Sequence, residues 1–311
     1  MRLLTAVPAA LAALAACVPS PVPDPDAAAE PGGPAWTQVT SGKAGEDRDP
    51  DLSPDGTRLF YASSAFGPDL DLYVRPVGAN SATRLTQWPG HERFPKPNPA
   101  APQTLAFCSN RDGTWRIYVM PDCHSRPGEA SPVSPPALHA LHPSWSKDGR
   151  RLAFSAAADP DAGPWTLHVL DVATGAVTAL EDVDGLLPEW SPAGNRLVFQ
   201  RMRRRDDWHG SLWTVELSGT SALHVTSLYA SEDMAAINPA WSPDGRRIAF
   251  ATAGPGGGDL WVVDADGAHA ARLTSAGSVE GMPAWGADGR IYFVSDRGGS
   301  ARIWSLDPGL R

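Results

Sequence analysis

Three carboxylates occupy the same place in a repeated sequence pattern. Asp47, Glu92 and Glu280 each lie three residues before a proline that recurs along the chain. Equivalent positions of neighbouring repeats meet at one end of a closed repeat domain, so we expect the three carboxylates at the mouth of a central channel. Such a group could bind a cation or receive the basic side chains of a partner. Ordinary polar loop residues are the alternative.

Other charged and aromatic residues fall in variable loops, where binding residues often lie on rigid scaffolds. In the longest of these loops, Trp208 could anchor an acidic partner beside the Arg203–Arg205 run, or the loop could be a solvated hairpin tip. The arginines of the segments 109–113 and 295–299 could bind a partner or donate to turn carbonyls. The candidate partner-binding residues are Asp47, Glu92, Arg93, Arg111, Arg203, Trp208, Glu280 and Arg297.

Enzyme motifs are absent from the sequence. It contains no Gly-x-Ser-x-Gly, no His-Glu-x-x-His, no P-loop and no dinucleotide-binding fingerprint. His91, His139 and His142 lie before successive strands, but their spacing is not that of a tight metal site. We therefore expect no catalytic residue, metal or cofactor. An active site built from scattered loop residues would leave no such motif.

A unit of about 45 residues repeats six times and must position these candidates. Its anchors are Pro50, Pro95, Pro143, Pro188, Pro239 and Pro283, spaced 45, 48, 45, 51 and 44 residues apart. A tryptophan lies two residues after four of them, and an Asp-Gly turn follows four of them. Each unit reads as four short strands rich in β-branched and aromatic residues, separated by turn residues. A period of this length with four strands predicts an all-β, six-bladed β-propeller.

The strand count indicates how the ring closes. Strands a, b and c occur six times, whereas the outer strand d occurs five times after Pro50. The segment 36–40, Trp-Thr-Gln-Val-Thr, has the sequence and position of the missing strand. We therefore expect an N-terminal outer strand to complete the last blade and remove its open edge.

Antiparallel blades sort their loops onto two faces. Loops b–c and d–a share one face, and the Asp-Gly turns and c–d loops share the other. The candidate residues almost all fall on the first face, so we expect the binding site there.

The N-terminus resembles a bacterial lipoprotein signal. Residues 3–16 are apolar but too short to span a bilayer, and they end in Leu-Ala-Ala before Cys17. This predicts a signal peptide over 1–16, lipidation of Cys17 and a proline-rich tether over 17–35 that precedes the propeller at 36–311. Val18 after the cysteine resembles outer-membrane sorting, so we expect a lipid-anchored protein at the outer membrane that faces the periplasm.

Composition limits the partners further. The 311 residues carry a net charge of −9, with a pI near 5.3, which disfavours nucleic acid as a partner. Cys108 and Cys123 fall near opposite ends of one predicted hairpin, beyond disulfide reach, so we expect two unpaired thiols. We expect a monomer.

The repeat resembles that of the TolB propeller family. The resemblance rests on Pro-x-Trp-Ser-Pro-Asp-Gly followed by Ile-Ala-Phe, and on the segments 109–120 and 295–304, and it covers residues 36–308. TolB itself is a soluble periplasmic protein with an α/β domain before its propeller, whereas here a lipobox stands in that place. The resemblance implies a six-bladed fold and an envelope partner, for which a peptidoglycan-associated lipoprotein is one candidate.

These observations favour a non-catalytic lipoprotein that presents a propeller as a protein-binding platform in the cell envelope. The alternative is a metal-assisted enzyme, such as a lyase, or a glycan-binding module that uses histidines and carboxylates at the channel mouth.

Overall fold

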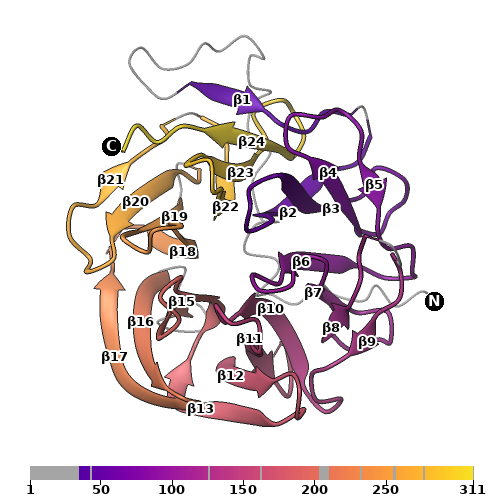
Figure 1. Ribbon diagram of the computed structural model, residues 1–311. Helices are drawn as coiled ribbons and strands as arrows, with labels where there is room; N and C mark the ends of the chain where they lie inside the picture. Colours follow the sequence, from indigo (N-terminus) through magenta and orange to yellow (C-terminus); the bar gives the residue numbers. More distant parts are fainter. Residues whose placement is uncertain are drawn as a thin grey trace.

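The computed structural model describes residues 35–42, 44–124, 127–161, 163–202, 210–231, 233–254, 257–275 and 277–310. In these residues the regular structure is β-strand, arranged as six four-stranded antiparallel sheets around a central axis (Figure 1). The predicted six-bladed β-propeller is confirmed. None of the described residues forms a helix that is long and apolar enough to cross a membrane.

Each blade runs from an inner strand at the axis to an outer strand at the rim. Blades 1 to 3 are β2 (Asp47–Leu52), β3 (Arg58–Ser63), β4 (Asp71–Pro76) and β5 (Thr83–Arg84); β6 (Glu92–Pro97), β7 (Leu105–Ser109), β8 (Arg116–Met120) and β9 (Ser131–Pro132); and β10 (His139–Trp145), β11 (Arg151–Ala157), β12 (Thr166–Asp171) and β13 (Val177–Asp184). Blades 4 and 5 are β14 (Leu186–Trp190), β15 (Arg196–Met202), β16 (Gly210–Ser218) and β17 (Ser221–Tyr229); and β18 (Ala235–Trp241), β19 (Arg247–Ala253), β20 (Leu260–Asp264) and β21 (Ala271–Arg272).

The N-terminal strand closes the ring, as predicted. Blade 6 contains β22 (Glu280–Trp285), β23 (Ile291–Ser295) and β24 (Arg302–Leu306), and its outer strand is β1 (Trp36–Gln38). Trp36 pairs with Leu306, and the pairing continues through Val39 N–H, which donates to the Ile303 carbonyl at 2.8 Å. The two ends of the chain thus share one sheet, and no open edge remains at the join.

Every inner strand carries a bulge at its anchor proline. The six residues before the prolines all have positive φ values of 52–57°: Asp49, Phe94, His142, Leu187, Asn238 and Met282. At each bulge, two inner-strand residues oppose one residue of the next strand, which is Tyr61 in blade 1 and a phenylalanine in the others. Proline has no N–H for the ladder, so a bulge is the place in a strand that tolerates it.

Arginines at the start of second strands tie neighbouring blades together. Arg151 lies 5.0 Å from the ring centre of Trp190 in the next blade and donates to the Gly219 carbonyl at 2.5 Å. Arg196 repeats this arrangement one blade further on, over Trp241 and the Ala265 carbonyl. At these two blade boundaries, the arginine of one repeat and the tryptophan of the next are therefore partners.

The Ser-Pro-Asp-Gly turns hold the inner hairpins in shape. The Ser53 hydroxyl donates to Asp55 at 2.5 Å, and the equivalent serine–aspartate pairs recur in blades 3 and 5. The hydrogen bonds that Asp55 accepts, first from Ser53 and then from the backbone and hydroxyl of Thr57, lower its pKa to about 2. Gly56 supplies the positive φ of 70° that the turn requires.

Two expectations about individual segments are settled by the structure. Cys108 and Cys123 are both buried and unpaired, as predicted. The outer strands of blades 3 and 4 are longer than the short strands expected for each unit, because β13 has eight residues and β17 has nine.

Candidate functional site

The six bulge residues narrow the centre of the channel. Together with five of the six anchor prolines, they surround a cavity of about 50 Å³. Arg93 donates to both Asp49 oxygens at 2.8 Å, and the ring of Phe94 meets His142 edge-on at 4.5 Å. Since these side chains fill most of the channel, only a very small ligand could pass this point.

A wider funnel opens on the side of the Asp-Gly turns. Its volume is about 350 Å³, and turn residues such as Ser53 and Pro192 line it, which fixes the face on which it opens. Its walls are formed mainly by four repeat tryptophans and by prolines: Trp145, Trp190, Trp241, Trp285, Pro54, Pro97, Pro99, Pro192, Pro243 and Pro283. Apolar walls of this kind are typical of sites that bind ligands or peptide side chains.

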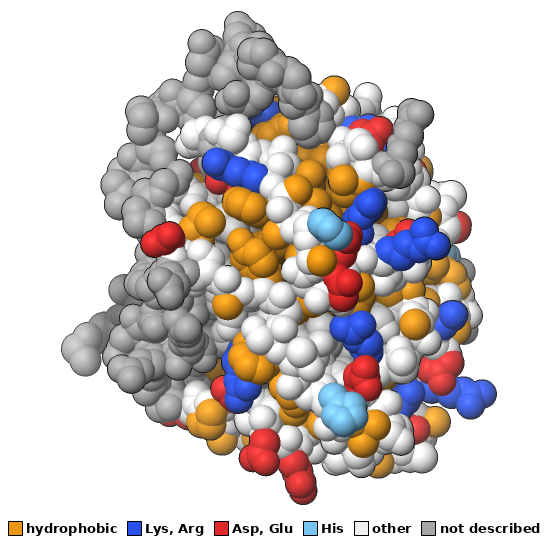
Figure 2. Space-filling view, turned by 90° about the vertical axis from the view of Figure 1, so that its left-hand side faces the viewer, with side chains coloured by type: hydrophobic (Ala, Val, Ile, Leu, Met, Phe, Trp, Pro, Cys, Tyr) orange, Lys and Arg blue, Asp and Glu red, His pale blue; other side chains and the backbone are white. Residues whose placement is uncertain are grey.

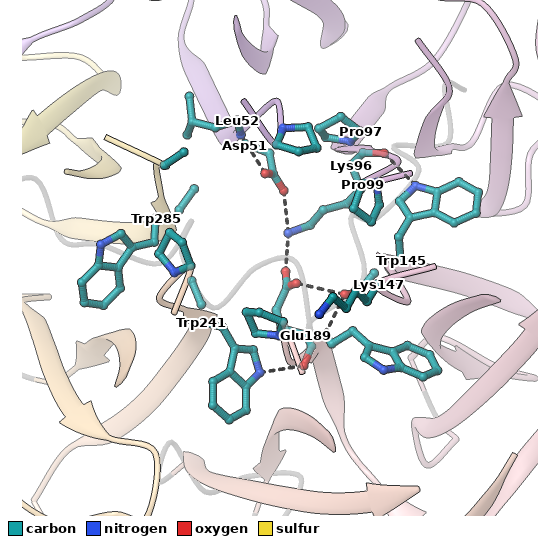
Figure 3. A pocket seen from close by; sticks show the side chains of 18 of the residues that line it. Asp51, Leu52, Lys96, Pro97, Pro99, Trp145, Lys147, Glu189, Trp241 and Trp285 are labelled. Atoms are coloured by element: carbon teal, nitrogen blue, oxygen red, sulfur yellow. Dashed lines mark hydrogen bonds and ion pairs between the residues drawn. The ribbon is translucent and has the colours of Figure 1, made fainter. Parts of the chain in front are cut away.

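An ionic bridge crosses the floor of the funnel (Figure 3). Lys96 of blade 2 contacts Asp51 of blade 1 at 2.7 Å and also pairs with Glu189 of blade 4. Ser144 of blade 3 donates to the other Glu189 oxygen at 3.0 Å. Side chains from four blades therefore meet at this layer, one residue beyond the anchor proline in each blade.

The electrostatics of the floor favour the bridged state. Burial would lower the pKa of Lys96, but Asp51 and Glu189 together raise it above its ordinary value. Burial raises the pKa of Glu189, and Lys96 opposes that shift. Two carboxylates share one ammonium group, so the floor carries a net charge near −1.

The funnel walls are held by their own hydrogen bonds. The indole N–H of Trp145 donates to the Lys96 carbonyl at 2.9 Å, and that of Trp241 donates to the Glu189 carbonyl at 3.0 Å. The walls and the floor therefore support each other. At the rim, Lys147 is exposed and has no ion pair within the described ranges.

The three predicted carboxylates do not ring an open channel mouth, which corrects the expected geometry. Glu92 is 0% exposed and Glu280 is 1% exposed, and Asp47 is also buried. Ser109 donates to Glu92 at 2.7 Å, Ser295 donates to Glu280 at 2.9 Å, and Arg302 lies 3.9 Å from Asp47. Each carboxylate begins an inner strand and is enclosed within the ring, where a partner cannot contact it.

Arg111 and Arg297 stand on aromatic platforms in equivalent loops. The guanidinium of Arg111 lies 3.5 Å from the ring centre of Trp88, and that of Arg297 lies 3.8 Å from that of Trp36. Both side chains are half-buried, and within the part of the chain that the structure describes neither guanidinium donates to a turn carbonyl, which was the alternative that we considered. Stacking therefore accounts for their positions, and their partner-binding role stays a proposal.

The other sequence candidates are dispersed. Arg93 is buried against Asp49 in the channel, so it is not presented to a partner. Arg203, Trp208 and Cys17 lie outside the described residues. The described ranges bring no three histidine, cysteine or acidic side chains together as metal ligands. In particular, His142 lies inside the channel rather than at its mouth beside His139 and His91.

The buried glutamates predict a pH-dependent stability. Burial raises the pKa of Glu92 to about 7 and that of Glu280 to about 8. Both values exceed the ordinary one, so the stability that the protonated forms provide is lost as pH rises through the folded pKa values. Through these two glutamates alone, the free energy of unfolding should fall by about 2–3 kcal/mol between pH 6.5 and 8.5. Histidines whose pKa values burial lowers, such as His142 and His168, oppose part of this loss, because about half of the unfolded histidines are still protonated at pH 6.5.

Glu280→Gln should remove the larger share of this loss, because glutamine has nearly the shape of protonated glutamate and does not titrate. Urea unfolding at the two pH values would measure the effect, and Glu181→Gln, on the exposed side of β13, is the matched control. Equal pH dependence in all three proteins would contradict the assignment.

The ionic floor was missed by sequence reasoning, although a signal existed. The residue after the anchor proline is Ser or Ala in three blades but Asp51, Lys96 and Glu189 in the others. Three charged residues at this one repeat position, which faces the axis, could have indicated an ionic site in the channel. The expected site fell on the opposite face, because most candidate residues lie in the variable loops there.

Comparison with known proteins agrees with this architecture. The family model of the TolB beta propeller domain matches residues 35–220 and 224–309. The Tol-Pal system protein TolB of Francisella tularensis is 26% identical over 209 residues, which is 67% of this chain and 46% of that protein. The chain thus spans less than half the length of the curated relatives it matches.

Solved structures share the fold at low sequence identity. A putative TolB from Agrobacterium tumefaciens superposes with a TM-score of 0.62 at 18% identity, over 84% of this chain and 90% of that chain. An oligogalacturonate lyase from Vibrio parahaemolyticus reaches 0.58 at 13% identity, over 88% and 97%. At these identities the likeness is one of fold alone, and it includes both a TolB protein and an enzyme.

Proposed function

The chain belongs to the TolB beta propeller domain family, and from this we propose that it is a non-catalytic, protein-binding propeller of the bacterial cell envelope. The observation that carries the proposal is the tryptophan-lined funnel above the Lys96 bridge. Its apolar walls can receive a side chain or a short extended segment of a partner. Its floor charges are already paired with each other, so they suit recognition better than proton transfer.

An envelope protein is the partner class that we propose. The curated relatives are named as proteins of a Tol-Pal system, and a peptidoglycan-associated lipoprotein is therefore one candidate for this chain. We place the protein at the outer membrane, facing the periplasm, with lipid on Cys17 as its anchor. The lipobox sequence supports this part of the proposal, and retention of Cys17→Ala protein in the membrane fraction would contradict it.

The enzymatic alternative has less support in this chain. It depended on histidines and carboxylates that converge at a channel mouth, and the described residues separate them. The resemblance to a lyase structure is one of fold. A protein-binding platform requires only the apolar walls and the paired floor charges that the funnel has.

Affinity capture from cross-linked envelopes tests the proposal. The double variant Trp285→Ala plus Lys147→Glu alters the funnel wall and rim without touching the floor. We expect it to lose at least ten-fold of the captured partner. Phe66→Ala is the matched control, because Phe66 is 76% exposed in the β3–β4 loop on the opposite face.

Each outcome of the capture is informative. Loss only in the funnel variant supports the proposed site. Loss only in Phe66→Ala would move the partner to the face of Arg111 and Arg297. The absence of any captured protein from the wild type would overturn the protein-binding function.

A further inference from the structure

The funnel combines apolar walls with a lysine at its rim. The indole N–H groups of its four tryptophans all donate to backbone carbonyls, so the rings offer apolar carbon surface to a ligand. Lys147 is exposed at the rim (Figure 3). On the outer side of the ring in Figure 2, by contrast, hydrophobic side chains lie among acidic and basic ones. The funnel therefore suits an apolar segment that has acidic residues beside it.

The chain itself contains such a segment close to the propeller. Residues 18–23 read Val-Pro-Ser-Pro-Val-Pro, Asp24 and Asp26 follow them, and no lysine or arginine occurs from 18 to 35. Each residue from 18 to 25 is a proline or precedes one, so the sequence favours the polyproline II conformation. Aromatic-lined grooves bind segments of this kind, because little conformational entropy is lost on binding. Residues 18–34 lie outside those that the structure describes.

The chain enters the propeller at the end of blade 6 where the funnel opens. Paired residues form one row across its four strands, from the rim to the funnel wall: Trp36, Leu306, Ile291 and Trp285. Adjacent strands lie about 4.8 Å apart, so the backbones of Trp36 and Trp285 are separated by about 14 Å. The start of β1 and the wall of the funnel are therefore neighbours at the same end of the blade.

The residues between the segment and β1 are long enough to reach the funnel. Residues 24–35 separate the proline-rich segment from Trp36. At about 3.1 Å per residue, they span up to about 37 Å when extended. This exceeds the distance across the blade by more than two-fold, so the segment can enter the funnel of its own chain.

We propose that residues 18–23 bind reversibly in the funnel of their own chain, with Asp24 and Asp26 at the rim near Lys147. The proline rings pack on the tryptophan walls, and the uncharged segment brings no like charge to the floor. An envelope partner that uses the same walls must displace the segment. Its apparent dissociation constant then rises in inverse proportion to the fraction of free funnels. The docking does not require that partner, so the purified chain alone tests it.

Disulfide formation tests the docking in the full mature chain with Cys17→Ser. Val22→Cys is combined with Pro243→Cys at the funnel or with Ala270→Cys on the rim of the same blade. We expect the funnel pair to form an intramolecular disulfide at least ten-fold faster than the rim pair. A tether that does not dock would reach Ala270 at least as readily, because it lies on the rim of the blade adjoining blade 6.

Removing the prolines separates docking from random collision. The native Cys108 and Cys123 are buried, so they should not compete for the new thiols. The funnel disulfide should slow to the rate of the rim pair when serine replaces four prolines, which keeps the tether length: Pro19, Pro21, Pro23 and Pro25. Equal rates for the two pairs, or no effect of the serines, would overturn the proposal. So would a disulfide-linked dimer as the main product.

Thiol alkylation gives an independent measurement that leaves the funnel intact. In the same Cys17→Ser background, Val22→Cys should react with iodoacetamide at least three-fold more slowly than Ala28→Cys, which lies between the segment and the propeller. Adding Trp285→Ala should abolish this difference, because it removes part of the wall. Thermal melting confirms that the variants are folded. Equal alkylation of the two thiols with Trp285 in place would contradict the docking.

Discussion

Replacing Lys96 by methionine is expected to lower the free energy of unfolding by about 3 kcal/mol at pH 7. Methionine keeps most of the apolar stem, so the change mainly removes the ammonium group. Asp51 and Glu189 would then face each other as partly buried like charges, each only 20–22% exposed. Because protonation relieves this repulsion, the variant should recover part of its stability as pH falls toward 5.

Two further variants isolate this effect. Lys147→Met removes a lysine that is exposed at the rim of the same funnel, and we expect a change of no more than about 0.5 kcal/mol. Adding Glu189→Gln to Lys96→Met should restore a large part of the lost stability, as a double-mutant cycle would show. If Lys96→Met and Lys147→Met behaved alike in chemical denaturation, the ionic bridge would not stabilise the ring.

Deletion of residues 36–40 is expected to prevent stable folding at 37 °C. The segment supplies β1 and, through Val39 and Thr40, further hydrogen bonds to Ile303. The Val39 carbonyl also accepts from Arg75 of blade 1 at 2.6 Å, so the segment contacts both blades at the join. Without it, blade 6 has three strands and an open edge, and the platform beneath Arg297 is lost.

A deletion of the same kind in the predicted tether is the control. Removal of residues 20–24 should leave the melting temperature within about 2 °C of the wild type, because the tether has the composition of a linker. Circular dichroism at 37 °C and thermal melting distinguish the two deletions. Native-like unfolding of the 36–40 deletion would show that ring closure contributes little.

The architecture could be predicted because the repeat encodes it locally. Anchor prolines, Asp-Gly turns and alternating strands define each blade, and the count of outer strands revealed the closure by residues 36–40. The unpaired state of Cys108 and Cys123 followed from strand direction alone. These features depend on neighbours in sequence or on simple geometry.

The site could not be predicted in the same way, because it depends on contacts between blades. Lys96 and Glu189 are 93 residues apart and meet only when the ring closes. Glu92 and Glu280 were expected at an open mouth, but strand pairing encloses them and serines satisfy one oxygen of each. The tryptophans were explained by the repeat pattern and so were not expected at the site. In the structure they form the funnel walls, and Trp190 and Trp241 also pack against arginines of neighbouring blades.

Site-specific photo-cross-linking tests the central claim, that the funnel is the docking site for an envelope protein. A photoreactive amino acid would replace Trp285 in one sample and Phe66 in another, in cells that carry the full chain. We predict a discrete cross-linked product with one envelope protein from position 285 and none from position 66. A product from position 66 alone, or from neither position, would contradict the account.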